Sequence, residues 1–184
     1  GERVALNFLQ RMSGIATMTA NMVASVKDLG VGIVDTRKTT PGLRLLEKYA
    51  VRQGGGVNHR MGLDDAVLIK DNHIAVAGGI KQAISMVRAN VSHMVKIEVE
   101  TENETEVREA LEAGADVIML DNMSPDEMAK MVKLINKRAI VEASGNVKLD
   151  TVKAIAKTGV DVISVGALTH SVSSLDISLD LFHR

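Results

Sequence analysis

One stretch of the chain concentrates cationic side chains around a run of three glycines. Between Asp35 and Lys70, seven cations face four acids, so that this segment is basic while the whole chain has a formal charge of −1. The cations are Arg37, Lys38, Arg44, Lys48, Arg52, Arg60 and Lys70. Cations on several short elements can converge on a small polyanion, and glycines let the backbone approach it closely. The segment therefore predicts a binding site for a ligand with several negative charges.

Cationic side chains occur in three short segments, each of which closes or follows an expected strand or follows a glycine turn. They are Arg37-Lys38, the triplet Asn58-His59-Arg60 and Lys70. Arginine binds carboxylates with two parallel hydrogen bonds and lysine supplies a movable charge, so these groups could hold an aromatic dicarboxylate or a phosphosugar. The alternative is a solvated network of surface ions. We expect Lys70 to be buried at the end of an apolar run, where it would need an anionic partner.

Two acids and two polar turns follow later expected strands. Glu100 and Asp121 end consecutive strands and could bind ribose hydroxyls or Mg²⁺, or stabilise a cationic transition state. Helix capping explains their positions equally well. Ser144-Gly145-Asn146 and Gly166-Ala167-Leu168 follow the last two strands, where barrels often bind phosphate through backbone N–H groups, although either turn could lack that role.

No zinc site is expected, because His59 and His73 have no second histidine at ligand spacing. The remaining histidines are expected to be structural or exposed. They are His93, His170 and His183.

The elements that must position these groups alternate between strand and helix. Strands are predicted at 32–35, 67–70, 95–100, 117–120, 140–143 and 162–165, and helices at 4–28, 79–89, 104–113, 125–136 and 149–157. Apolar strands alternating with helices predict a parallel sheet. Polar groups at the carboxyl end of nearly every strand favour an α/β barrel over an open doubly wound sheet. Because six strands are few for closure, we expect one incomplete TIM-like α/β-barrel domain over residues 1–184, with 1–28 as a long helix leading into it.

Composition narrows the functional classes. The 184 residues are 46% apolar and 24% charged, as in a soluble globular protein, and no cysteine is present for a disulfide, a thiolate metal site or a thiol nucleophile. No apolar run reaches the about 20 residues that span a bilayer and no signal peptide opens the chain, so we expect a cytoplasmic protein. Aromatic residues are only 2%, which argues against single-stranded nucleic acid as a partner. The first residue is Gly1, within the expected long helix, which suggests a piece of a longer protein.

Motifs along essentially the whole chain resemble quinolinate phosphoribosyltransferase, also called nicotinate-nucleotide pyrophosphorylase. In the order of that family they are DTRKTTPGLR at 35–44, GGVNHR at 55–60, LIKDNH at 68–73, EVE at 98–100, LDNM at 120–123, VEASG at 141–145 and ISVGALT at 163–169.

The resemblance implies a type II phosphoribosyltransferase of NAD biosynthesis. Such an enzyme converts quinolinate and phosphoribosyl pyrophosphate to nicotinate mononucleotide, pyrophosphate and CO₂ with Mg²⁺. The resemblance also implies a homodimer or higher homo-oligomer, without a nucleic acid or membrane partner. The resemblance also implies which residues contact the pyridine dicarboxylate and the pyrophosphate: Thr36, Arg37, Lys38, His59, Arg60 and Lys70. It places Glu100 and Asp121 on the ribose side, where they would meet Mg²⁺ through the substrate pyrophosphate, and it makes them catalytic together with Lys38.

The remaining implied contacts are to the 5′-phosphate. The residues expected there are Ser144, Gly145, Asn146, Gly166, Ala167 and Leu168. The family usually has a second glycine where Asn146 stands, and asparagine tolerates the left-handed backbone that such a turn needs.

A second departure from the family concerns its N-terminal α/β sandwich domain, which is largely missing here. In the family's dimer that domain covers the partner's active site and contributes an arginine. We therefore expect weak turnover from these residues alone, and exposed apolar surface. Three alternatives stay open: a Schiff-base aldolase-type barrel using Lys70, the family's molybdenum-transport-associated relative, and a non-catalytic anion-binding barrel.

Overall fold

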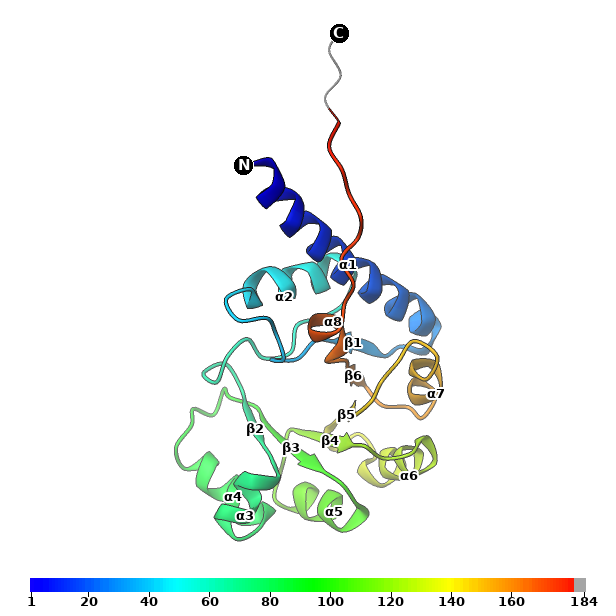
Figure 1. Ribbon diagram of the computed structural model, residues 1–184. Coiled ribbons are helices and arrows are strands. Elements are labelled where there is room, and N and C mark those ends of the chain that lie inside the picture. The colour runs from blue at the N-terminus through cyan, green and yellow to red at the C-terminus, as the bar shows by residue number, and fades with distance from the viewer. Residues whose placement is uncertain (181–184) are drawn as a thin grey trace.

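Six parallel strands form a single curved sheet that does not close into a barrel (Figure 1). The computed structural model describes residues 1–180. Its strands are β1 (Gly32–Val34), β2 (Val67–Ile69), β3 (Ile97–Thr101), β4 (Val117–Asp121), β5 (Ile140–Ser144) and β6 (Val162–Ser164). Their order is β1-β6-β5-β4-β3-β2, and every neighbouring pair is parallel. Within these residues β1 and β2 are the two edges, which confirms the predicted incomplete barrel.

Helices connect the parallel strands and lie around the outside of the sheet (Figure 1). They are α1 (Glu2–Val26), α2 (Arg44–Gln53), α3 (Asp71–Ala77), α4 (Ile80–Arg88), α5 (Glu104–Glu112), α6 (Pro125–Ile135), α7 (Val152–Ala156) and α8 (Ala167–His170), with a short 3₁₀ turn, η1 (Lys27–Leu29). The five predicted helices are present with small differences at their ends. The sequence reasoning missed α2, α3 and α8.

Local sequence explains where several of these helices begin and end. The hydroxyl of Ser124 accepts a hydrogen bond from the N–H of Glu127, whose carboxylate accepts one from the N–H of Ser124. This capping box, with proline at the first helical position, starts α6. Asn136, in a left-handed conformation with φ 46°, ends it. The side chain of Asn103 caps α5 in a similar way.

The core between the sheet and its helices is aliphatic and rich in methionine. Ile97 on β3, Ile118 on β4 and Ile163 on β6 are fully buried, and Met22 and Met128 pack from the helices. Flexible methionine side chains fill the gaps that large aromatic rings would otherwise occupy. Because successive residues of a strand point to opposite faces, the alternate residues are left facing the inside of the curved sheet.

Exposed apolar side chains lie on several elements of the structure. Among these elements are α1 and α2, the two helices that pack together near β1 (Figure 1). The exposed side chains include Val4 and Leu9 on α1, and Leu45 and Tyr49 on α2, all at least half exposed. The segment that follows α8 runs back over α1, where the N–H of Leu175 donates to the carbonyl of Gln10. None of the helices in residues 1–180 combines the length and the apolar character that a membrane crossing requires.

Candidate active site

A cavity of about 800 Å³ opens at the carboxyl ends of the strands. The predicted site residues that line it are Thr36, Arg37, Lys38, His59, Arg60, Lys70, Glu100, Asp121, Ser144, Gly145, Asn146, Gly166 and Ala167. Leu168 is the exception, because it does not line the cavity and its side chain is fully buried in the core, so its predicted backbone contact to a phosphate stays a prediction. The structure thus brings together side chains from all six strand ends.

The cavity wall contains two layers of inward-facing residues. Nearest the mouth are Lys70, Glu100, Asp121, Ser144 and Gly166, and two residues earlier along the chain from four of them are Leu68, Met119, Glu142 and Ser164. Glu98, two residues before Glu100, does not line the cavity. The residues between them, such as Ile69 and Val99, belong to the core. The two-residue period of a strand therefore gives the site a charged mouth and a mixed apolar and acidic floor.

Only four of the seven clustered cations line the cavity, so the predicted concentration of positive charge was partly wrong. Lys48 is fully buried and forms an ion pair with Asp35. The guanidinium of Arg44 donates to Thr39 Oγ1 and to the carbonyl oxygens of Arg37 and Met61. Arg52 is exposed on α2. These three cations belong to the scaffold, because α2, which the sequence reasoning missed, turns them away from the cavity.

The glycine run was also wrongly predicted to approach a ligand. A Cβ atom on Gly54 would lie 2.4 Å from the carbonyl oxygen of Ala16, and one on Gly56 would lie 2.8 Å from side-chain carbons of Thr19 and Val51. Real Cβ atoms do not come that close, so these glycines allow the end of α2 to pack against α1. The run positions the loop that follows it and does not contact the cavity itself.

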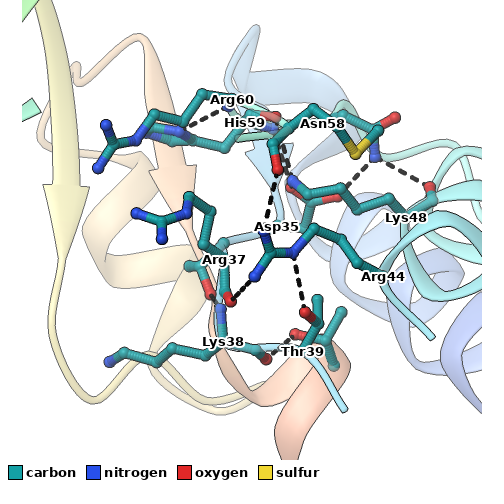
Figure 2. Close-up of polar contacts among 12 residues, drawn as sticks. Asp35, Arg37, Lys38, Thr39, Arg44, Lys48, Asn58, His59 and Arg60 are labelled. Atoms are coloured by element: carbon teal, nitrogen blue, oxygen red, sulfur yellow. Dashed lines mark hydrogen bonds and ion pairs between the residues drawn. The ribbon is translucent and has the colours of Figure 1, made fainter. Parts of the chain in front are cut away.

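A buried carboxylate holds that loop in place (Figure 2). Asp35, directly after β1, accepts hydrogen bonds from Lys48 Nζ, Asn58 Nδ2 and the backbone N–H of His59. Asn58 Nδ2 also donates to the carbonyl of Lys48 at 2.9 Å, and the Lys48 ammonium donates to the carbonyl of His59 at 3.1 Å. A charge-assisted network of this kind is rigid because every partner fixes the next. It places His59 and Arg60 at the cavity.

Two arginines form a cationic wall of the cavity. Figure 2 shows Arg37, Lys38 and Arg60 extending toward the same side. Burial, and then the like charge of Arg37, lowers the pKa of Arg60 from its ordinary value. Among residues 1–180, the buried Nε of Arg37 has no hydrogen-bond partner. Repelling guanidinium groups with a spare donor favour an anionic ligand between them.

Lys70 differs from its expected environment. Its side chain is 46% exposed, where burial was predicted, and its ammonium lies 2.7 Å from the Glu100 carboxylate. The expected anionic partner is therefore present, at the cavity mouth. Ser124 and Asn103 cap the helices after β4 and β3, which removes the capping role considered for Asp121 and Glu100. Both acids instead line the cavity.

The predicted phosphate turns have the backbone that their sequences suggested. Asn146 adopts φ 48°, so it does take the left-handed conformation where glycine is usual. Gly145 has φ +100°, and a Cβ atom there would lie 2.2 Å from Asn122 Oδ1. Gly166 lies beside Lys38 and His170, since a Cβ atom on it would meet side-chain atoms of both within 3.4 Å. These contacts place the turn at Gly166 next to a lysine and a histidine that can face an anion, and the turn at Gly145 next to Asn122.

The sequence reasoning noted Glu98 and Glu142 as polar strand-end groups but gave them no role. His59 Nε2 lies 3.1 Å from a Glu98 oxygen and 3.6 Å from a Glu142 oxygen, and both acids are buried. Burial, with the charge of Glu98, raises the pKa of Glu142 to about 8. Although burial lowers it, the hydrogen bond to Glu98 and the charge of Glu142 raise the pKa of His59 overall. The two-residue spacing from Glu100 and Ser144 was the signal that could have placed both acids at the cavity.

Other cavity residues were also missed. They include Asn122, Val147, Lys148, His170 and Ser171. His170 is exposed, as expected, and it also lines the cavity, while His183 lies outside the described residues. Asn122 donates to Asp121 at 2.7 Å and so orients that carboxylate. Except for His170, at the end of α8, these residues lie on loops, whose approach to the cavity no local pattern reveals.

Comparison with known proteins agrees with this geometry. Residues 15–180 match the family model described as quinolinate phosphoribosyl transferase, C-terminal domain. The chain is 57% identical over 181 residues to the probable nicotinate-nucleotide pyrophosphorylase [carboxylating] of Bacillus subtilis (strain 168), which covers 98% of the chain and 63% of that relative. Its counterpart from Methanocaldococcus jannaschii is 53% identical, with 98% and 66% covered.

Solved structures give the same result. The nicotinate-nucleotide pyrophosphorylase from Ehrlichia chaffeensis superposes with a TM-score of 0.94 at 49% identity, covering 97% of the chain and 65% of that structure. NadC from Streptococcus pyogenes gives 0.91 at 50% identity, covering 95% and 61%. The chain thus spans less than two thirds of the length of these relatives. It belongs to the quinolinate phosphoribosyl transferase family, whose C-terminal domain it matches.

Proposed function

We propose that this chain carries the catalytic barrel of a quinolinate phosphoribosyltransferase. The reaction joins quinolinate to phosphoribosyl pyrophosphate and yields nicotinate mononucleotide, pyrophosphate and CO₂ for NAD biosynthesis. The observation that carries the proposal is the pair Arg37 and Arg60, whose like charges share one cavity wall and favour an anionic ligand. The names of the relatives, which include quinolinate phosphoribosyltransferase [decarboxylating] from Nicotiana tabacum, point to the same reaction.

The cationic wall would bind and orient the pyridine ring. Arg37 and Arg60 can each form paired hydrogen bonds to a carboxylate, and Lys70 adds a charge at the mouth. Holding both carboxylates fixes the ring nitrogen along the line of attack on the ribose. The activation barrier for that attack is lowered because the reacting atoms are already oriented in the complex. Leu68 and Met119 supply apolar surface in the same cavity for the ring itself.

The acids and the turns would bind the sugar. As pyrophosphate leaves, positive charge develops on the ribose, and the Glu100 and Asp121 carboxylates can stabilise it. Lys38 lies beside Gly166, so it can bind either phosphate end of the substrate. The turns at 144–146 and 166–167 would receive the 5′-phosphate through their backbone N–H groups.

The same acids suit Mg²⁺, a hard cation that prefers carboxylate oxygens together with substrate phosphates and water. Glu100 and Asp121 would hold it by way of the substrate. The bound ion would offset the charge of the pyrophosphate.

We also propose a homodimer or higher homo-oligomer that acts in the cytoplasm on these small substrates, without a nucleic acid or membrane partner. The exposed apolar side chains of α1 and α2 support an additional packing partner of this kind. The compartment varies among relatives, since the Oryza sativa protein is named chloroplastic and the Nicotiana proteins mitochondrial.

The alternative chemistries find less support. A Schiff-base lysine must lose its proton, and Lys70 instead lies against Glu100 as an ion pair. The relatives named above favour quinolinate over the molybdenum-associated alternative. The non-catalytic anion-binding barrel differs from the main proposal only in turnover.

Calorimetry with quinolinate and an assay of pyrophosphate release test the proposal together. We expect quinolinate to bind and pyrophosphate to appear when phosphoribosyl pyrophosphate and Mg²⁺ are added. Binding without turnover by the full-length protein would favour the non-catalytic barrel, and absence of quinolinate binding would contradict both.

Arg60→Ala tests the cationic wall. Because charged hydrogen bonds contribute about 1.5–3 kcal/mol, the variant should bind quinolinate with roughly 10- to 150-fold lower affinity. Lys70→Ala should lose affinity within the same range. Arg52→Ala is the matched control, since Arg52 is exposed and outside the cavity. Calorimetry that finds equal affinities for Arg60→Ala and Arg52→Ala would remove Arg60 from the binding site.

A further inference from the structure

A buried acid cluster belongs to the cavity floor and has no role in the reaction described so far. Glu142 on β5 lines the cavity with a side chain only 4% exposed, and Glu98 on β3 lies behind it at 8%. One oxygen of each carboxyl, Oε1, is buried without a hydrogen-bond partner in residues 1–180. Burying two acids side by side is costly, so the fold would not retain them without some compensation.

The hydrogen bonds around His59 indicate where the protons lie. His59 Nδ1 accepts a hydrogen bond from the backbone N–H of Arg60 at 2.8 Å. Nδ1 therefore carries no proton in the neutral ring, and Nε2 carries it and donates to Glu98. Glu98 thus accepts this hydrogen bond, as an ionised carboxylate does.

Glu142 is then the member of the pair that holds a proton. Two carboxylates this close cannot both be ionised in a buried site. Burial and the Glu98 charge raise the pKa of Glu142 to about 8, against the opposing effects of His59 and the Ser164 hydroxyl. Glu142 is accordingly a neutral acid at pH 7 that opens directly into the cavity.

A metal ion is the competing explanation for the cluster. One atom each from His59, Glu98 and Glu142 lie within 4.8 Å of one another, which is compatible with a divalent cation. To bind a metal, however, Nε2 would have to give up its proton to Nδ1, which faces the N–H of Arg60. Two N–H groups cannot face each other at 2.8 Å without repulsion, so the geometry favours a proton over a metal ion.

The proposed reaction contains one step that needs such a proton. Once the ring nitrogen is bonded to ribose, the bond from ring carbon 2 to its carboxylate breaks, and CO₂ leaves without the bonding electron pair. That pair stays on carbon 2, where the positive ring nitrogen stabilises it. A proton must then bond to carbon 2 before CO₂ recombines with it.

Resting on the proposed function, we infer that Glu142 is the catalytic acid that protonates ring carbon 2 as CO₂ departs. The O–H bond of Glu142 breaks, the C–H bond forms, and the resulting carboxylate regains a proton from solvent after the product leaves. Glu142 lies in the floor layer with Leu68 and Met119, which give that part of the cavity apolar surface. The mouth acids Glu100 and Asp121 are instead engaged as acceptors of hydrogen bonds from Lys70 and Asn122.

Glu142→Gln tests the assignment in the full-length protein, because the amide keeps the shape of the side chain and removes the acidic proton. A general acid contributes about 10²- to 10⁴-fold, so the single-turnover rate of CO₂ release should fall by that factor. Quinolinate affinity should stay within about threefold of wild type, which also shows that the variant is folded. Glu142→Asp should recover part of the rate, and Glu102→Gln, an exposed control outside the cavity, should match wild type. A Glu142→Gln rate equal to that of wild type would overturn the inference.

The pH profile gives a second test that does not depend on the Glu142 variants. The reactive form is protonated, so the wild-type rate of CO₂ release should be constant below about pH 8 and fall above it. Glu98→Gln removes the negative charge that raises the pKa of Glu142, so the decline should begin at lower pH. A wild-type rate that stays constant to pH 10 would contradict the assignment.

Two further measurements distinguish a failure of the role inferred for Glu142 from a failure of the proposed function. If wild type releases pyrophosphate and makes nicotinate mononucleotide while Glu142→Gln keeps pace, only the role of Glu142 fails. If wild type does not bind quinolinate, the proposed function fails before any variant is made, and the inference falls with it. Calorimetric titration with Mn²⁺ that shows a site lost in Glu142→Gln would overturn the proton assignment in favour of a metal.

Discussion

Lys48→Met should destabilise the protein by about 3–5 kcal/mol. The substitution removes a fully buried ammonium while roughly keeping its volume, and it leaves the equally buried Asp35 carboxylate without its counter-charge. Breaking a buried ion pair from one side costs that much because the remaining charge stays desolvated. Chemical denaturation measures the change in the free energy of unfolding.

Controls separate the buried charge from the helix that carries it. Arg52→Met lies one turn further along α2 on an exposed position, so it should change the unfolding free energy by no more than about 0.5 kcal/mol. Lys48→Met combined with Asp35→Asn removes both charges and should recover part of the loss. A Lys48→Met protein as stable as Arg52→Met would show that the pair carries no such energy.

The same substitution should weaken quinolinate binding although Lys48 does not line the cavity. Its ammonium donates to the carbonyl of His59, and Asp35 holds the N–H of that residue. Losing Lys48 therefore loosens the loop that positions His59 and Arg60. Binding that stays at the wild-type level in a destabilised Lys48→Met protein would limit the network to a structural role.

Glu100→Gln should lower turnover by about 10²- to 10³-fold while quinolinate still binds. Removing one preorganised electrostatic partner of a developing charge has effects of this size. The carboxylate is also the partner of Lys70 at 2.7 Å, so its loss leaves that ammonium free for an anionic ligand. Affinity for quinolinate should consequently stay equal or rise as the rate falls.

Steady-state kinetics and calorimetry on the same preparations check this opposite movement of rate and affinity. Glu102→Gln, two residues further and exposed outside the cavity, should leave both unchanged. Glu100→Ala should lower the rate in the same way. An unchanged rate in either Glu100 variant would remove the role assigned to this carboxylate.

The two layers of the cavity differ in chemical character and are suited to different parts of the reaction. Mouth residues, such as Lys70, Glu100 and Asp121, carry formal charges that suit ionic substrates and Mg²⁺. Floor residues, such as Leu68, Met119 and Glu142, surround the deeper space with apolar groups and one buried carboxyl, behind which Glu98 lies. Since each mouth residue lies two positions after a floor residue on its strand, a shift of one residue in register would exchange cavity and core.

Strands and later helices were predictable because their signals are local. Apolar runs bounded by polar residues predicted each strand to within two residues, and the helix predicted at 125–136 begins at Pro125 as α6 does. The carboxyl-end position of Arg37, Lys70 and Asp121 followed from strand direction alone. Parallel strands bring such ends to one edge, so the sequence sufficed to predict a shared mouth.

Whether each cation on α2 is buried or exposed depends on tertiary structure. Lys48 and Arg52 lie one turn apart, and yet one is fully buried against Asp35 and the other exposed. Charge predicts exposure, and only the packing of α2 against α1 over Gly54 and Gly56 reverses that for Lys48. The cationic run looked like one ligand site because neighbours in sequence were taken as neighbours in space.

What the sequence determined by itself is thus the chain of elements, the family motifs and the edge of the sheet where polar groups gather. Only the tertiary structure decided which charges face the cavity, and that Glu98 and Glu142 are buried together beside His59. The physical reason is that hydrogen bonding and strand periodicity act over a few residues, whereas burial and pKa depend on groups that are distant in sequence. Glu98 and Glu142 are 44 positions apart, and curvature of the sheet brings their carboxyl oxygens within 4.8 Å.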